Sequence, residues 1–155
     1  MAEVPIDEVA GHILIDAARE AAVHAHAPYS RFGVGAALLM ADGSIVTGTN
    51  FENASYGLSL CAETVAVATA NAQGRLREIV AVGVIGGRIG PNGLEGDAAV
   101  RPCGRCRQIL NEAAQLGGRT DFLVYSASAD GSVIEKRTLA QLLPDAFGPA
   151  DLGIG

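Results

Sequence analysis

The sequence predicts a three-layer α/β/α fold with a five-stranded mixed sheet in the middle layer. Apolar residues make up 49% of the 155 residues, which is enough for a full hydrophobic core. Segments with helical periodicity alternate with short apolar runs, and this alternation requires crossovers that cover both faces of a sheet. No internal repeat or linker interrupts the series, so we expect one domain over residues 1–155.

The first predicted elements are a helix and an antiparallel hairpin. Apolar residues recur at helical spacing over residues 6–26, and Pro28 ends this helix. Strand-like runs follow at residues 33–40 and 44–50. The Asp-Gly pair at residues 42–43 predicts a tight turn between these two strands.

The middle of the chain is predicted to form a helix, a strand, a loop and a second helix. Ala and Val residues cover almost every face of the helix expected at residues 61–73, which places it in the interior. A buried strand follows at residues 78–86, and a glycine-rich loop follows at 87–101. Pro102 suits the first position of a helix and opens the next one, which runs to about residue 114.

The last third of the chain is predicted to complete the sheet. Strands are expected at residues 122–127 and 133–135, with a turn at the Asp-Gly pair of residues 130–131. A last helical turn at residues 138–143 precedes Pro144.

The charge balance and the N-terminus narrow the classes of function. The formal net charge is −6, and an acidic surface repels phosphates, which argues against a nucleic-acid partner. No apolar run approaches the roughly 18 residues that a membrane span needs. The first five residues lack the basic and apolar regions of a signal peptide. We therefore expect a cytoplasmic protein with neither a membrane nor a nucleic-acid partner.

Three cysteines stand at two predicted helix starts. Their odd number argues against a disulfide framework, so Cys61, Cys103 and Cys106 are expected to be reduced thiols. Cys103 and Cys106 are three positions apart and share one face of a helix. Cys61 starts another helix of the same sheet, and ligands of open α/β sheets collect where strands end and helices begin. Three thiolates that converge there leave the fourth position of a zinc ion open, as in catalytic sites.

A carboxylate follows two residues after the first of these cysteines. Glu63 is placed to accept a proton from a water molecule that such a metal ion activates. Three metal-binding side chains beside a glutamate that does not bind the metal are typical of zinc-dependent nucleobase deaminases.

Five segments carry a more specific resemblance, and they extend over residues 27–147. They are Ala-Pro-Tyr-Ser-Arg-Phe-Gly-Val-Gly-Ala-Ala-Leu at 27–38, Thr-Asn-Phe-Glu-Asn-Ala at 49–54, Cys-Ala-Glu at 61–63, Pro-Cys-Gly-Arg-Cys-Arg-Gln at 102–108 and Leu-Leu-Pro-Asp-Ala-Phe at 142–147. With these segments in this order, the chain resembles the small homotetrameric cytidine deaminases. The resemblance implies a cytidine deaminase-like fold. It also implies hydrolytic deamination of free cytidine and 2′-deoxycytidine to uridine and 2′-deoxyuridine, with release of ammonia, in pyrimidine salvage.

The resemblance assigns roles to residues in these segments. It implies that Cys61, Cys103 and Cys106 hold one Zn²⁺ per subunit, and that Glu63 carries protons from water to the base and to the leaving ammonia.

Further implied roles concern the nucleoside. Asn50 and Glu52 match residues that hold the ribose hydroxyls, and Phe32 matches an aromatic residue that packs on the pyrimidine. The backbone amide of Ala62 matches a contact to the base carbonyl. The positions that complete the pocket of a neighbouring subunit are Ala54 to Tyr56 and Phe147.

One position departs from the family pattern. The family often places an arginine directly after the catalytic glutamate, where it neutralises the ligand thiolates, and this chain has Thr64 there. Zn²⁺ with three thiolates carries a net charge of −1, which helix N-termini offset in part. Arg105 or Arg107 can take the place of the missing arginine, or Thr64 can hydrogen-bond a sulfur.

Each of these residues also has a purely structural interpretation. Cys61 can be a small core residue, and Cys103 and Cys106 can form a redox pair. Glu63 can stabilise a helix N-terminus. Asn50 and Glu52 can simply mark a strand end. Phe32 and Phe147 can be core aromatic residues. The histidines are expected on the surface of the first helix, away from the motifs, and they are His12, His24 and His26.

Three other functions compete with deamination of cytidine. A deaminase of another small aminated nucleoside, such as a nucleoside antibiotic, is the nearest alternative, and the Asn50–Glu52 pair favours a ribose-bearing substrate. A nucleic-acid-editing deaminase typically uses histidine as its first ligand and needs a basic channel, so Cys61 and the net charge of −6 argue against it. A non-catalytic zinc module needs a fourth protein ligand, and the sequence offers no fourth cysteine.

Overall fold

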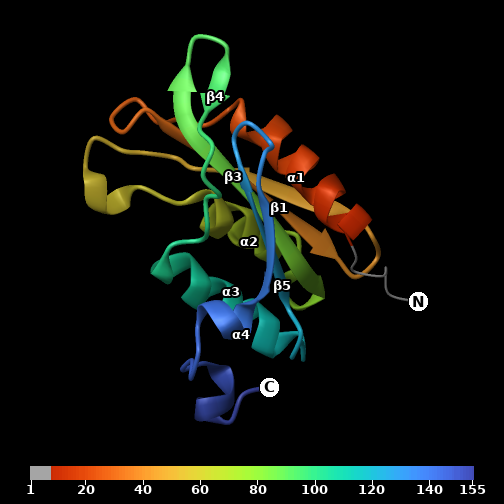
Figure 1. The fold of residues 1–155 in the computed structure, drawn as a ribbon. Helices are drawn as coiled ribbons and strands as arrows, with labels where there is room; N and C mark the ends of the chain where they lie inside the picture. The colour runs from red at the N-terminus through yellow and green to blue at the C-terminus, as the bar shows by residue number, and fades with distance from the viewer. Residues whose placement is uncertain (1–7) are drawn as a thin grey trace.

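A mixed β-sheet runs through the centre of the molecule (Figure 1), and the computed structural model describes residues 8–155. The strands of its main path are, in spatial order, β2 (Ile45–Thr49), β1 (Phe32–Met40), β3 (Ile79–Gly90), β5 (Leu123–Ser128) and β6 (Ile134–Thr138). A short strand, β4 (Gly93–Glu95), pairs with the end of β3. β3 and β5 are parallel, whereas the other neighbours are antiparallel, which confirms the predicted mixed sheet.

Helices cover both faces of this sheet, as the α/β/α prediction requires. The helices are α1 (Glu8–Ala22), α2 (Ala62–Ala72), α3 (Gly104–Leu116) and α4 (Leu139–Leu142), with the short 3-10 helices η1 (Tyr56–Leu58), η2 (Leu76–Glu78) and η3 (Pro149–Leu152). On the α1 face, Leu14 and Tyr125 belong to one hydrophobic core. On the α2 and α3 face, Val67, Leu110 and Phe122 belong to a second core. The central strands β1, β3 and β5 are therefore buried on both faces over most of their length, and they bear apolar residues on both sides.

Two glycines let helices lie unusually close to the sheet. A Cβ at Gly35 of β1 would lie 1.9 Å from the carbonyl oxygen of Ala18 in α1. A Cβ at Gly48 of β2 would lie 2.5 Å from the backbone nitrogen of Ala66 in α2. Neither approach is possible with a side chain, so these glycines fix the positions of α1 and α2 on the sheet.

The first helix ends at Ala22, and the prediction that it continues to residue 26 is wrong. The backbone N–H of His26 donates to the carbonyl of Asn50 (3.2 Å), and the carbonyl of His26 accepts from the N–H of Glu52 (2.8 Å). These bonds to a distant segment use the groups that a helix would need at residue 26. The predicted helix start at residue 6 lies outside the described residues.

The loop predicted at residues 87–101 is wrong in its first half. β3 continues to Gly90, and a hairpin leads directly into β4. A Cβ at Gly87 would lie 2.5 Å from the carbonyl oxygen of Glu95, so the paired backbones require glycine there. Glycine is depleted in strands generally, which is why composition alone predicted a loop.

The third predicted helix begins later than expected. Cys103 is its N-cap with an extended backbone and Gly104 is its first residue, so Pro102 precedes the helix instead of opening it. The other predicted helices and strands occur where they were expected, with boundaries that differ by at most three residues. Among the helices of residues 8–155, none is long and apolar enough to cross a bilayer.

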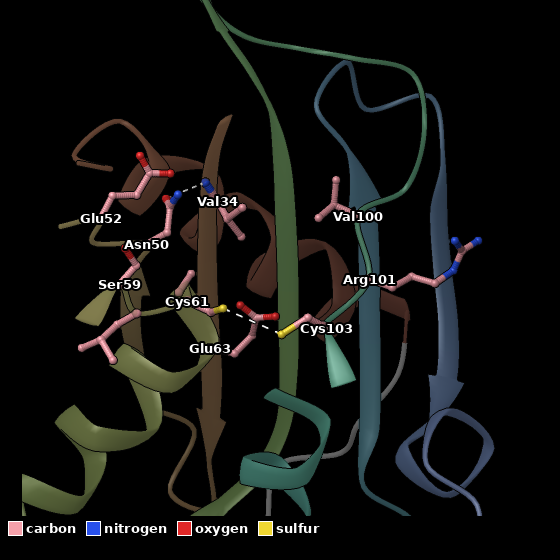
Figure 2. Close-up of a pocket in the computed structure, with 11 residues that line it drawn as sticks. Val34, Asn50, Glu52, Ser59, Cys61, Glu63, Val100, Arg101 and Cys103 are labelled. Carbon is pink, nitrogen blue, oxygen red and sulfur yellow. Dashed lines mark hydrogen bonds between the residues drawn. The ribbon is translucent and has the colours of Figure 1, made fainter. Parts of the chain in front are cut away.

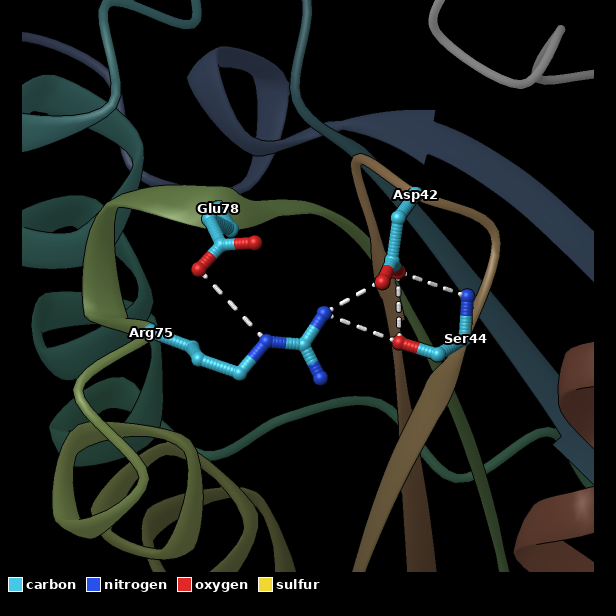
Figure 3. A network of polar contacts seen from close by, with 4 residues as sticks. All are labelled: Asp42, Ser44, Arg75 and Glu78. Atoms are coloured by element: carbon cyan, nitrogen blue, oxygen red, sulfur yellow. Dashed lines mark hydrogen bonds and ion pairs between the residues drawn. The ribbon is translucent and has the colours of Figure 1, made fainter. Parts of the chain in front are cut away.

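A polar network closes the end of the β1–β2 hairpin (Figure 3). Arg75 follows α2 in the chain, and its guanidinium donates to the carboxylate of Asp42 (3.0 Å) and to the hydroxyl of Ser44 (2.9 Å). It also lies 3.5 Å from the carboxylate of Glu78. The network links α2 to the hairpin turn at the end of β1 that is remote from Phe32.

Candidate active site and metal centre

A pocket of about 290 Å³ opens where α2 and α3 begin (Figure 2). Figure 2 shows Asn50 and Glu52 on one side of it, Val100 and Arg101 on the other, and Glu63 between them. The full lining is Val34, Asn50, Glu52, Ser59, Leu60, Cys61, Ala62, Glu63, Val100, Arg101 and Cys103. The pocket thus joins both motif-bearing helix starts to the end of β2.

Three cysteine sulfurs meet at one end of this pocket. Cys61 is the N-cap of α2, Cys103 is the N-cap of α3, and Cys106 lies in the first turn of α3. Their sulfur atoms all lie within 4.8 Å of one another. The Cys61 and Cys103 sulfurs are 3.8 Å apart, far beyond a disulfide bond of about 2.05 Å, so all three residues are free cysteines.

The sulfur geometry fits a zinc ion. Two sulfurs bound to a tetrahedral zinc at about 2.3 Å each are about 3.8 Å apart, which is the spacing between Cys61 and Cys103. Within residues 8–155, the group of metal-ligating atoms at this spacing comprises the three cysteine sulfurs alone. Thiolates select zinc over harder cations, and three protein ligands leave one position for water or substrate. The cluster is therefore suited to one zinc ion with an open coordination position.

The neighbours of Cys106 include a group that can offset the negative charge of the thiolates. Thr64 Oγ1 lies 3.4 Å from Cys106 Sγ, within hydrogen-bond distance of a sulfur. Arg107 does not take this place, because its guanidinium donates to the backbone carbonyls of Pro102 (2.7 Å) and Leu142 (2.9 Å). Of the alternatives that the sequence left open, the structure places Thr64 within hydrogen-bond distance of the sulfur and directs Arg107 elsewhere.

The acid–base properties of the cluster follow from crowding and burial. A hydrogen bond to Cys61, burial and the nearby Glu63 carboxylate raise the pKa of the Cys106 thiol. The same hydrogen bond lowers the pKa of Cys61. A metal ion at this cluster binds the deprotonated thiolates, so its binding displaces the protons of the thiols.

Glu63 is the buried carboxyl group of the pocket. Its side chain is 3% exposed, and burial raises its pKa above the ordinary value. A raised pKa brings the titration of a carboxyl group closer to neutral pH, where the group can both accept and release a proton. Glu63 thus has the environment of a proton-transfer group beside the metal cluster.

Hydrogen bonds within the chain hold the polar groups on the opposite side. Asn50 accepts a hydrogen bond from the N–H of Val34 (2.9 Å) and donates one to the carbonyl of Phe32 (2.8 Å). Glu52 accepts hydrogen bonds from the turn that precedes β1, and these bonds lower the pKa of its carboxyl group. An ionised carboxylate and an amide at this place can bind hydroxyl groups of a ligand.

Comparison with known proteins accounts for this combination of groups. The sequence model of the cytidine and deoxycytidylate deaminase zinc-binding region matches residues 11–116, which include all three cysteines and Glu63. This chain belongs to the cytidine and deoxycytidylate deaminase family. The sulfur cluster is the part of the chain that suits the metal of that zinc-binding region.

Individual relatives agree with the family assignment. The cytidine deaminase of Halalkalibacterium halodurans is 44% identical over 140 residues, which are 90% of this chain and 96% of the relative. The cytidine deaminase of Mycobacterium tuberculosis is 42% identical over 135 residues, 87% of each chain. The crystal structure of a cytidine deaminase from Burkholderia pseudomallei is similar with a TM-score of 0.75 and 42% identity, and the match covers 88% of this chain and 98% of that one.

Several residues with expected roles lie outside the pocket of this deaminase-family chain. Phe32 is 40% exposed and shares a face of β1 with Val34, which lines the pocket. Tyr56 and Phe147 are 72% and 62% exposed, Ala54 is also exposed, and none of the three lines the pocket. The structure therefore brings the cysteines, Glu63, Ala62, Asn50 and Glu52 together and leaves these aromatic side chains on the surface.

His26 corrects another expectation. The sequence placed it on the first helix, away from the motifs, but its backbone pairs with Asn50 and Glu52. Its ring lies 5.6 Å from the ring of Phe51. No local pattern signals this pairing, because the partners are more than twenty residues apart.

The sequence also missed several lining residues. The alternation of β1 could have indicated Val34, two positions after Phe32. For Arg101 the sequence offers no such signal. Its guanidinium turns away from the pocket and donates to the carboxylate of Glu135 on β6 (2.8 and 2.6 Å). This pair ties the segment directly before Cys103 to the sheet. The other missed residues are Ser59, Leu60 and Val100.

Proposed function

We propose that this chain is a zinc-dependent cytidine deaminase, which hydrolyses free cytidine and 2′-deoxycytidine to uridine and 2′-deoxyuridine with release of ammonia. The observation that carries the proposal is the position of the buried Glu63 carboxyl in one pocket with three cysteine sulfurs suited to zinc. Asn50 and Glu52 on the opposite wall favour a nucleoside over a free base. The names of relatives about 40% identical over most of the chain support the same reaction.

Cys61, Cys103 and Cys106 would hold the zinc ion, which supplies a Lewis acid that makes water nucleophilic near neutral pH. Glu63 accepts a proton from the attacking water and delivers it to the ring nitrogen next to C4 of the base. After the water oxygen has added at C4, Glu63 takes the remaining proton of that new hydroxyl and delivers it to the exocyclic amine. The C4–N bond then breaks, ammonia leaves, and the C4 oxygen becomes the carbonyl of uridine. Burial of Glu63 suits this role, because a raised pKa favours the protonated form that donates.

The nucleoside is oriented from two sides. Ala62 is the first residue of α2, so its backbone N–H has no acceptor within the helix and is available to the carbonyl of the base. Asn50 and Glu52 bind the sugar hydroxyls, and Phe32 packs on the pyrimidine from the start of β1. These contacts place C4 of the base toward the sulfur cluster.

We infer that the active unit is a homotetramer with shared sites. Ala54, Tyr56 and Phe147 are exposed and outside this chain's own pocket, where they are free to complete the pocket of a neighbouring subunit. Each subunit is one domain over residues 1–155, and it functions in the cytoplasm, where its three thiols stay reduced.

Zinc quantification together with a cytidine turnover assay tests the proposal. We expect about one zinc per chain, and a fall of the ultraviolet absorbance of cytidine as uridine forms. The control is a single-stranded oligonucleotide, which the acidic chain should neither bind nor deaminate. A zinc-loaded protein that leaves cytidine and 2′-deoxycytidine unchanged would refute the proposal.

A further inference from the structure

The turn that precedes β1 wraps around the carboxylate of Glu52. The N–H groups of Tyr29 (3.0 Å) and Ser30 (3.1 Å) donate to one carboxylate oxygen, and the hydroxyl of Ser30 donates to the other. Arg31 adopts a left-handed backbone (φ 58°), a conformation that residues with a side chain rarely adopt. The turn therefore accepts backbone strain in a conformation that points three donors at one side chain.

The Ser30 hydroxyl has a second partner. Its oxygen accepts a hydrogen bond from the backbone N–H of Phe32 (3.1 Å). The direction of both bonds is fixed by chemistry, because an ionised carboxylate can only accept and a backbone N–H can only donate. Ser30 thus links the backbone N–H of Phe32, the first residue of β1, to the carboxylate of Glu52 through two consecutive hydrogen bonds.

The count of acceptor positions on Glu52 shows what remains for a ligand. A carboxylate offers about four lone-pair positions. The two N–H groups use both positions of one oxygen, and the Ser30 hydroxyl uses one position of the other. The remaining position lies on the oxygen that Ser30 holds, so the orientation of this oxygen determines whether Glu52 can accept a ligand hydroxyl.

We propose that Ser30 is a positioning residue for nucleoside binding, which holds the free lone pair of Glu52 toward the sugar and keeps it in register with Phe32. This inference rests on the proposed cytidine deaminase function. It deepens that function because Ser30 couples the residue expected to bind the sugar with the residue expected to pack on the base. One free acceptor position also means that Glu52 accepts a single hydroxyl, and the ring hydroxyl that ribose and 2′-deoxyribose share is the 3′-OH.

The contacts of Asn50 support the same coupling. Its amide donates to the carbonyl of Phe32 (2.8 Å), so both peptide groups of Phe32 are bound to the sugar-side residues, one directly and one through Ser30. Loss of the Ser30 hydroxyl would free the carboxylate of Glu52, whereas the direct bond from Asn50 would still hold Phe32. The effect should fall on substrate binding, because neither Ser30 nor Phe32 lines the pocket beside Glu63 and the sulfurs.

Steady-state kinetics of Ser30→Ala with cytidine and 3′-deoxycytidine test the proposal. We expect KM for cytidine to rise about tenfold, as for the loss of a hydrogen bond to a charged group, with kcat changed by less than about threefold. KM for 3′-deoxycytidine should stay within about twofold of the wild-type value, because this substrate lacks the hydroxyl that Glu52 accepts. Ser30→Thr retains a hydroxyl and should restore most of the affinity for cytidine.

Three outcomes would overturn this role. An unchanged KM for cytidine in Ser30→Ala, or an equal loss with both substrates, would show that Ser30 only stabilises the turn. A further loss when Ser30→Ala is added to Glu52→Gln would show that it does not act through Glu52. If Ser30→Ala fails to fold, Ser30→Cys provides the same comparison with a weak donor of similar size. A wild-type protein without cytidine turnover would instead refute the proposed function, and with it this role.

Discussion

The hydroxyl oxygen of Thr64 lies 3.4 Å from the sulfur of Cys106, one residue after the buried Glu63. A neutral donor therefore occupies the place where the family resemblance leads one to expect an arginine. A hydrogen bond to a thiolate offsets less charge than a guanidinium does. Cys61 and Cys103 are N-caps and Cys106 lies in the first turn of α3, so all three sulfurs lie at helix N-termini, which favour negative charge.

An arginine at position 64 should change the pH dependence of turnover without loss of zinc. Thr64→Arg should keep zinc and move the acidic limb of the kcat pH profile to lower pH, because a nearby cation favours deprotonated groups. Thr64→Val is the matched control, which removes the hydroxyl at nearly constant volume and should weaken zinc binding by about tenfold to a hundredfold. An unchanged pH profile in Thr64→Arg would show that position 64 does not tune the metal centre.

Glu63→Gln should separate chemistry from metal binding. The variant keeps the shape of the side chain but cannot accept or deliver a proton, so kcat should fall by about 10² to 10⁴. Zinc content should stay the same, and Tm should not fall, because burial already disfavours the charged carboxylate. Full turnover in a zinc-loaded Glu63→Gln protein would contradict the assigned role.

Arg101→Met should reduce stability in a pH-dependent way. The Arg101 guanidinium beside Glu135 lowers the pKa of that carboxyl from its ordinary value of 4.5. The stabilisation is therefore present above pH 4.5 and is lost as the pH falls through the lowered pKa. Thermal unfolding should show a lower Tm for the variant at neutral pH and no difference in strong acid.

A matched control locates the effect of Arg101. Arg75→Met removes the guanidinium that pairs with Asp42 at the remote end of the hairpin, so it should lower Tm and leave zinc retention unchanged. Arg101→Met should in addition release zinc more readily to a chelator, because it loosens the segment before Cys103. Equal zinc retention in both variants would argue against a link between Arg101 and the metal centre.

Mixed oligomers should reveal whether subunits share sites. Phe147→Ala should have low activity because it lacks a pocket residue, and Glu63→Ala should have low activity because it lacks the proton carrier. If Phe147 serves a neighbouring pocket, mixing the two variants should form some sites with both residues intact and restore measurable turnover. No recovery after verified subunit exchange would mean that Phe147 does not reach another subunit's site.

Local patterns were sufficient for most of the fold and for the metal cluster. Cys103 and Cys106 share a helix face because of their spacing alone, and Cys61 meets them because both helix starts lie at one edge of the sheet. The long-range contacts were not accessible in this way. The bonds of Ser30 to Glu52 and of Arg101 to Glu135 join segments more than twenty residues apart, and no periodicity encodes them.

The errors have the same origin. The local pattern extends the first helix to His26, whereas the backbone of His26 pairs with Asn50 and Glu52. β4 was missed because the glycines that its close pairing requires resemble a loop in composition. In both cases tertiary contacts override local propensity.

X-ray absorption at the zinc edge of the purified protein tests the central claim most directly. With three cysteine thiolates and one open position, the spectrum should show three sulfur neighbours at about 2.3 Å and one lighter oxygen or nitrogen neighbour. Addition of a substrate analogue should change the lighter neighbour and leave the sulfurs in place. A shell of four protein ligands, or fewer than three sulfurs, would contradict the account.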